Sequence, residues 1–302
     1  MAILSELNDL IYYIVVQFRL IFPYWIAGLI AGSVISVFAS YKIRNLVLRV
    51  NTGKYWVLAG LLAALLGAAS PICMYGTVPL IATLGRKGVS QHLLVSFMVT
   101  SILINPNLFI LSFALGTPLA LVRMLVCIIA GILAGVIVRI FFKNRAVFGL
   151  DGFEDRKKCS TGGNRAKVFL GDLNRAITKT APYFLAGILL TALFEMYFPK
   201  DIFIDIFDNN RGLGVLLASS FGVPVYICGG GTVPLLKAWI SAGMSPGSAI
   251  AFIISGPATK LTNLGAVKII LGVRNFVFYI LFNIAFSVTA GFSVDAVYSF
   301  LK

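Results

Sequence analysis

Long apolar stretches alternate with short polar segments along the whole chain. Eight apolar stretches are visible, two of them with an internal polar break, and they cover residues 18–40, 55–72, 77–115 (broken), 117–142, 180–198, 212–228, 232–266 (broken) and 275–294. A helix needs about 20 apolar residues to cross a hydrocarbon core that is about 30 Å thick. The pattern therefore predicts an all-α polytopic membrane protein with about 8 apolar helical segments.

One pattern occurs twice along the chain. The segment PICMYGTVPL, which contains Cys73, returns 155 residues later as VYICGGGTVPL, which contains Cys228. Upstream, FPYWIAGLI matches APYFLAGIL. Self-similarity of this kind is the signature of a repeated architecture. The sequence therefore predicts a first transmembrane repeat, a basic linker and a second transmembrane repeat, at residues 1–142, 143–175 and 176–302.

Composition supports the membrane assignment and indicates a location. Hydrophobic residues make up 59% of the 302 residues and charged residues only 12%, against about 25% in an ordinary soluble domain. These proportions exclude a water-soluble globular protein. The formal net charge is +14, but most of the excess lies in short loops and in the linker. Because Lys and Arg accumulate on the cytoplasmic side of membrane proteins, we expect the cytoplasmic membrane, a cytoplasmic linker and no nucleic-acid partner.

The same charges bear on the relative orientation of the repeats. Four crossings in each half would make the repeats parallel and would place the basic loop at 41–54 on the opposite side from the basic linker, against the positive-inside tendency. If 55–87 and 212–241 are re-entrant hairpins, each half crosses three times and most basic loops share one side. The charge distribution therefore favours two inverted repeats with re-entrant or broken helices, with parallel repeats as the alternative.

Four polar breaks interrupt the apolar stretches. Two are Cys-Gly turns at 73–79 and 228–234, and each ends in Thr-Val-Pro, where proline fits the first turn of an outgoing helix. The other two lie at 104–107 and 255–260. Non-helical backbone at membrane depth is tolerated only inside protein or beside a watery cavity, and paired interrupted helices indicate a transporter's midplane site. The breaks therefore predict a permease that works by alternating access around such a site.

Polar and thiol side chains at these breaks are the candidate substrate contacts. The thiols suit a soft, thiophilic solute, although cysteine also packs as a small hydrophobe. An ammonium inside an apolar run costs about 2.5 to 3.5 kcal/mol, so Lys260 suits a negatively charged solute, although a lysine near a helix end also extends to the membrane surface. The predicted substrate-binding residues are Cys73, Tyr75, Thr77, Asn105, Asn107, Tyr226, Cys228, Thr232, Thr259, Lys260 and Asn263.

The second-half motif resembles a known family. The run PVYICGGGTVPLLKAWISAGMSPGSAIAFIISGPATK, from Pro224 to Lys260, is similar to the second-half signature of the ArsP-type predicted permeases, and the first-half turn after Pro71 is similar to that family's P-x-C-S-C-G turn. The resemblance implies an inner-membrane permease, and some members of the family export trivalent organoarsenicals. Two departures, Met74-Tyr75 in place of Ser-Cys and Lys260 in place of Asn, move the site from soft-atom chelation toward anion binding.

Several function classes lack their motifs. No GxxxxGK[ST] phosphate-binding loop is present, and no acidic residue lies in the middle of an apolar run, as a carboxylate proton relay would require. An enzyme with Cys228 as nucleophile lacks a well-placed histidine base, and we expect the lone His92 to be interfacial rather than a metal ligand. We therefore expect neither enzymatic activity nor a cofactor or metal.

The sequence leads to one preferred function and two alternatives. We expect a permease for a small solute, with efflux of a thiophilic, organoarsenical-like compound as the first substrate class. The first alternative is a transporter or channel for a small inorganic or sulfur or selenium oxyanion that uses Lys260. The second is a non-transporting structural membrane subunit. The expected partners are the lipid bilayer and a small-molecule or anionic substrate, and a homo-oligomer is left open.

Overall fold

Helices account for all regular structure in the described part of the chain. The computed structural model describes residues 56–70, 74–86, 88–142, 147–149, 214–220, 232–241 and 243–300, with short stretches between 8 and 30 and between 169 and 189. No strand occurs among these residues. This agrees with the predicted all-α class. The helices are α3 (Trp56–Ala69), α4 (Met74–Arg86), α5 (Gln91–Leu103), α6 (Pro106–Ser112), the 3-10 turn η2 (Phe113–Leu115), α7 (Thr117–Phe141), α11 (Thr232–Ser241), α12 (Pro246–Thr259) and α13 (Leu261–Phe300).

Two of the described helices are long and apolar enough to cross a membrane by themselves. They are Thr117–Phe141 and Ile270–Phe300. A third span results if the bent pair Gln91–Leu103 and Leu108–Leu115, whose axes differ by 48°, counts as one. Many aliphatic side chains on these helices are exposed, as expected for surfaces that face lipid.

The helices before and after the linker follow the same order and bend at matching glycines. In the described residues, positive φ occurs only at Gly88, Gly116, Gly243 and Gly272. Gly88 and Gly243 are 155 residues apart, and Gly116 and Gly272 are 156 apart. Glycine populates this region of φ without steric cost, so both halves turn at the same places. Gly272 divides α13 into a first part, 261–271, that corresponds to α6 and η2, and a second part, 273–300, that corresponds to α7.

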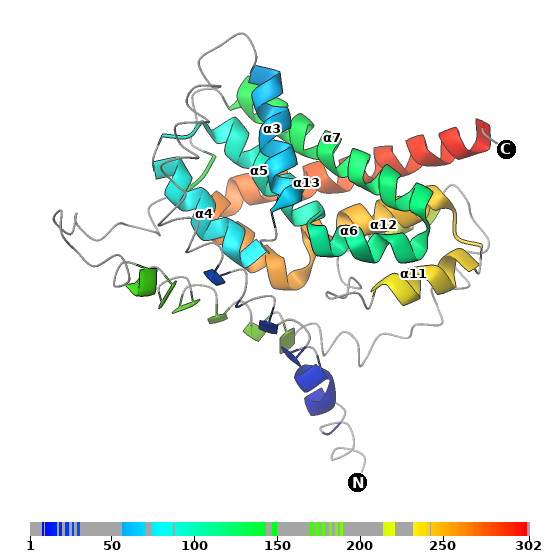
Figure 1. Cartoon of the computed structure of the whole chain (residues 1–302), viewed down its shortest axis with the longest axis horizontal. Coiled ribbons are helices and arrows are strands. Elements are labelled where there is room, and N and C mark those ends of the chain that lie inside the picture. Colours follow the sequence, from blue (N-terminus) through cyan, green and yellow to red (C-terminus); the bar gives the residue numbers. More distant parts are fainter. Residues whose placement is uncertain are drawn as a thin grey trace.

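Corresponding helices run in opposite directions. In Figure 1 the colours show that α7 runs from right to left and the second part of α13 from left to right, and that α5 and α12 run toward each other from opposite ends of the molecule. α5 also contacts α12. The helices near Thr-Val-Pro bridge the two halves, because α4 packs against both α5 and α13, and α11 packs against both α12 and η2. The two halves are therefore interlocked rather than placed side by side.

The start of the linker is fixed at one end of this arrangement. Val147 N–H donates to Gln91 Oε1 at the start of α5 (2.6 Å), and Gly149 N–H donates to Ile270 O beside the bend of α13 (2.8 Å). Asn275 Nδ2 donates to Val147 O (2.8 Å). This end of the molecule therefore joins the first half, the linker and the bend in the second half.

Candidate substrate site at the helix breaks

The two breaks that follow α5 and α12 are narrower than the sequence predicted. Only Ile104 and Asn105 are extended in the first half, and Pro106 already begins α6. Proline suits this position because the first N–H groups of a helix have no partner within it. In the second half, α12 continues through Pro257 to Thr259, and the break is confined to Lys260 (φ −53°, ψ 133°). The predicted breaks at 104–107 and 255–260 were therefore too long.

Side-chain hydrogen bonds reach carbonyls near the end of α12. The last carbonyls of a helix have no partner within it, and buried carbonyls need other partners at membrane depth. Thr259 Oγ1 donates to Ser255 O (2.6 Å), and Asn263 Nδ2 donates to Pro257 O (3.1 Å). Two predicted site residues, Thr259 and Asn263, thus hold the break in shape.

Arg123 of α7 stabilises the first-half break. Its side chain is buried, and its guanidinium donates to Ser112 Oγ (2.6 Å), to Leu103 O at the end of α5 (3.4 Å) and to Leu108 O in α6 (3.5 Å). The last carbonyls of a helix carry partial negative charge. The guanidinium therefore donates hydrogen bonds to backbone carbonyls on both sides of the break.

Tyr279 does the equivalent work in the second half. Its hydroxyl donates to Ala258 O (3.0 Å), and both the ring and the hydroxyl are buried. Arg123 and Tyr279 each lie seven residues after a positive-φ glycine, and their respective acceptors, Leu103 O and Ala258 O, are 155 residues apart. Neither Arg123 nor Tyr279 is among the predicted site residues. An arginine inside the apolar run 117–142 was the available signal.

Asn105 and Lys260 occupy equivalent positions at the two breaks, 155 residues apart. Asn105 caps α6, because its Oδ1 accepts from Leu108 N–H (2.9 Å). Lys260 has no acceptor in its side chain. It is 1% exposed, and its Nζ has no hydrogen-bond partner within the described part of the chain. The side chain is enclosed by protein, which argues against the alternative in which this lysine extends to the membrane surface, and its role as a substrate contact stays a prediction.

No described carboxylate neutralises Lys260. Among the described residues the only acidic one is Asp295, which accepts from Ser245 Oγ (2.8 Å) and Gly247 N–H (2.7 Å) at the start of α12. Lys260 follows the other end of that helix, about 20 Å away at 1.5 Å per residue. A cation at a helix C-terminus gains about 0.3 to 1 kcal/mol, less than the roughly 2.5 to 3.5 kcal/mol that burial in a membrane costs.

The structure describes both Thr-Val-Pro segments as helical. α4 begins at Met74, so the predicted turn over 73–79 is helical from its second residue and Pro79 lies beyond the first turn. α11 covers Thr232–Ser241 and includes Pro234, and the residues before it lie outside the described part of the chain, so the predicted first-turn position of this proline stays a prediction. Thr77 is buried and its Oγ1 lies 2.9 Å from Ser101 Oγ of α5. This threonine therefore joins α4 to the helix that ends at the first break.

The remaining predicted contacts lie outside what the structure describes. This holds for the residues Cys73, Tyr226 and Cys228, and for the side chains of Tyr75, Asn107 and Thr232. The thiol part of the predicted site stays a prediction. The described residues of the predicted site are Thr77 on α4, Asn105 at one break, and Thr259, Lys260 and Asn263 at the other.

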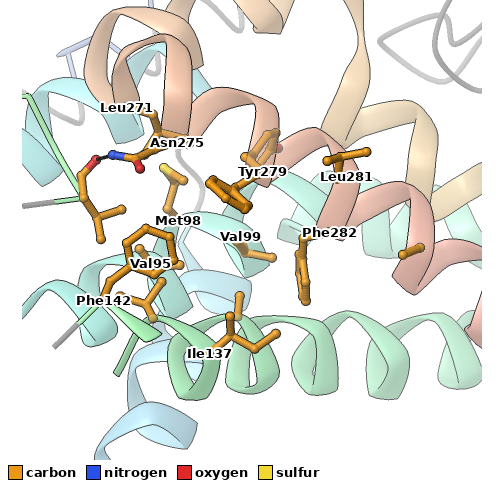
Figure 2. A pocket seen from close by; sticks show the side chains of 15 residues that line it. Val95, Met98, Val99, Ile137, Phe142, Leu271, Asn275, Tyr279, Leu281 and Phe282 are labelled. Atoms are coloured by element: carbon orange, nitrogen blue, oxygen red, sulfur yellow. Dashed lines mark hydrogen bonds between the residues drawn. The ribbon is translucent and has the colours of Figure 1, made fainter. Parts of the chain in front are cut away.

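An apolar cavity of about 350 Å³ lies between the halves, next to Tyr279. Figure 2 shows Val95, Met98 and Val99 of α5 and Ile137 of α7 on one side, and Leu271, Asn275 and Tyr279 of α13 on the other. Its walls offer almost no free polar group, since the Asn275 amide is bound to Val147 O and the Tyr279 hydroxyl to Ala258 O. This cavity therefore offers a polar solute almost no hydrogen-bond partner.

His92 contacts a cation rather than metal ligands. It is partly buried at the start of α5, and its Nε2 lies 3.5 Å from Arg139 Nη1. No group of three His, Cys, Asp or Glu that could hold a metal ion occurs among the described residues.

Comparison with known proteins identifies the family. The sequence matches ArsP_1, a family described as predicted permeases, over residues 3–295. The chain belongs to the ArsP_1 family. The UPF0718 protein YcgR of Bacillus subtilis (strain 168) is 27% identical over 282 residues, which are 89% of this chain and 90% of YcgR. The UPF0718 protein MJ0584 of Methanocaldococcus jannaschii is 22% identical over 172 residues, 57% of this chain and 42% of that protein. No solved structure matches the chain.

Family membership confirms the resemblance read from the second-half motif. ArsP_1 proteins are described as permeases, and the long apolar helices fit a multi-pass membrane protein. The chain is therefore a membrane permease.

Proposed function

We propose that this ArsP_1 protein moves a small solute across the cytoplasmic membrane by alternating access around the two helix breaks. The observation that carries the proposal is a pair of equivalent hydrogen bonds: Arg123 donates to Leu103 O at the first break, and Tyr279 donates to Ala258 O at the second. We call these two residues the clamps of the breaks. Each clamp comes from the long helix that follows its break. A movement of either long helix therefore changes the geometry of its break.

The packing between the two halves supports the same mechanism. α4 contacts α13, and α11 contacts η2, so a helix of one half lies against the post-break segment of the other. The opposite directions of corresponding helices in Figure 1 favour inverted repeats. Inverted repeats have two conformations related by exchange of the roles of the halves, which open a central site to opposite sides.

Two cargo classes follow from the residues at the breaks. A thiophilic compound would depend on Cys73 and Cys228, as the family resemblance implies. An anion would depend on Lys260, whose burial and missing partner favour it among the described residues. Both classes belong in the same transport experiment.

The test is a counterflow assay in proteoliposomes that contain the purified chain. The panel has a neutral trivalent methylarsenical, selenite, sulfite and sulfate, with protein-free liposomes as the control. An alternating-access carrier should give saturable uptake of at least one solute, and the same unlabelled solute inside the vesicle should accelerate it. Saturable flux without such acceleration would contradict alternating access. Flux equal to that of empty liposomes for all four solutes would favour the structural-subunit alternative.

A further inference from the structure

Lys260 differs from the other buried cation of the described residues. Arg123 directs its guanidinium at three protein acceptors around the first break. Lys260 is equally enclosed, but its ammonium has no hydrogen-bond partner in the described chain. Buried charges in proteins are paired or fully hydrogen-bonded. The second break therefore has an unmatched positive charge, and the described carboxylate, Asp295, is bound at the far end of α12.

The helix that follows Lys260 adds positive partial charge at its first N–H groups, next to the positive charge of the ammonium. At the first break, Asn105 Oδ1 accepts from a backbone N–H of the next helix. At the second break the side-chain acceptor is replaced by an ammonium, and Lys260 contributes only its backbone carbonyl, to Asn263 N–H and Leu264 N–H. The first N–H groups of a helix have no partner within the helix and attract anions. The segment 261–271 is long enough to have this effect.

We propose that the cargo of this permease is a small oxyanion, bound by the Lys260 ammonium and by the backbone N–H groups of Leu261 and Thr262, the first two of α13, since the next two already donate to Lys260 O. The ammonium offers three donors, and the helix start adds more, so a ligand with several acceptor oxygens uses them better than a single-atom anion does. The inference rests on the proposed permease function. Because Lys260 is 1% exposed, the oxyanion reaches it only in a conformation that opens one side of the break.

The first experiment measures ligand stabilisation of the full chain in detergent. Thermal unfolding is followed against increasing selenite or sulfite, with chloride holding the ionic strength constant. A ligand that binds the native state raises the unfolding temperature in a saturable way. We expect Lys260→Asn to weaken oxyanion binding by about tenfold or more, Lys260→Arg to retain part of it, and Lys268→Gln to leave it unchanged. Lys268 is a matched control because it is an exposed lysine on the same helix.

Asparagine is the informative replacement because the first half already has it at the equivalent position, Asn105. Unchanged oxyanion binding in Lys260→Asn would overturn the inference. A second measurement needs no variant. In the wild-type chain, saturating selenite should protect Lys260 from an amine-acylating reagent, read by peptide mass spectrometry, while acylation of Lys268 stays the same. Equal acylation of Lys260 with and without selenite would also overturn it.

The outcomes separate this inference from the permease proposal. Counterflow of the neutral methylarsenical with no oxyanion binding would leave the permease proposal standing and refute the oxyanion. Oxyanion binding that Lys260→Asn abolishes, with no flux of any solute, would support the anion site and refute the permease proposal.

Discussion

Arg123 and Tyr279 show how one structural task is met by different side chains. The segment after the first break is short, because α6 ends at Ser112 and a 3-10 turn follows, so carbonyls on both sides of the break need partners. A guanidinium can supply several donors at once. The segment after the second break is helical until Gly272, and one hydroxyl on Ala258 O suffices there. The cost of burying an arginine is therefore balanced by the number of carbonyls it satisfies.

This difference predicts unequal effects of removing the two clamps. Arg123→Met removes three hydrogen bonds around the first break, including the side-chain donor to the buried Leu103 O, and should lower the free energy of unfolding by about 1 to 3 kcal/mol or more. Tyr279→Phe removes one hydrogen bond and should cost about 0.5 to 1.5 kcal/mol. Arg274→Met is the control, because Arg274 is exposed on the same helix as Tyr279. Denaturant titration in detergent measures the free energy of unfolding of all three variants. A larger loss of this free energy for Arg274→Met than for Arg123→Met would contradict the role of Arg123 in stabilising the break.

Close contact between α5 and α7 depends on two glycines one turn apart. Gly131 and Gly135 of α7 lie against Ser96 and Thr100 of α5, whose hydroxyls bond to carbonyls of their own helix. Small residues at this spacing let two membrane helices approach closely, and dispersion and packing then hold them. Because α7 carries Arg123 and α5 ends at the first break, this contact sets the position of the clamp.

A methyl group at either glycine should separate the two helices. A Cβ at Gly131 would lie 3.0 Å from Ser96 O, and one at Gly135 would lie 2.9 Å from His92 O, backbone atoms that cannot rotate away. We expect Gly131→Ala and Gly135→Ala each to destabilise the protein by about 1 to 3 kcal/mol, as overpacking does. The matched control is Gly60→Ala in α3, where a Cβ meets only Ser96 Oγ at 3.9 Å. Equal melting temperatures for Gly131→Ala and Gly60→Ala would rule out this account of the interface.

The sequence predicts the elements of the molecule better than their junctions. Apolar length and the repeated Thr-Val-Pro motif are enough to place α7, the ends of α4 and α11 at Arg86 and Ser241, and the position of Lys260 at a break. They do not show that α12 continues through Pro257 to Thr259, or that Thr259 and Asn263 bond to carbonyls near its end. They also miss the clamps, since those contacts join residues 20 and 21 positions apart across a bend.

The two ends of the molecule provide a direct test of the inverted arrangement. The start of the linker binds at Ile270, whereas Asp295, near the far end of the same spanning helix, binds the start of α12. About 25 residues of helix, roughly 37 Å at 1.5 Å per residue, separate these contacts. Positions equivalent in the repeats should then face opposite sides of the membrane. Arg86 and Ser241 are such a pair, 155 residues apart at the ends of α4 and α11.

Cysteines at these two positions distinguish inverted from parallel repeats. With a membrane-impermeant maleimide and site-resolved mass spectrometry, Arg86→Cys should be labelled in inside-out vesicles and Ser241→Cys in intact cells, because the positive-inside tendency places Arg86 in the cytoplasm. The native Cys159, in the basic linker, is an internal marker for the cytoplasmic side and stays in place. Parallel repeats predict the same side for both positions, since equivalent residues of parallel repeats have the same orientation. Labelling of both from one side would therefore refute the inverted arrangement and, with it, the symmetry on which the alternating-access proposal depends.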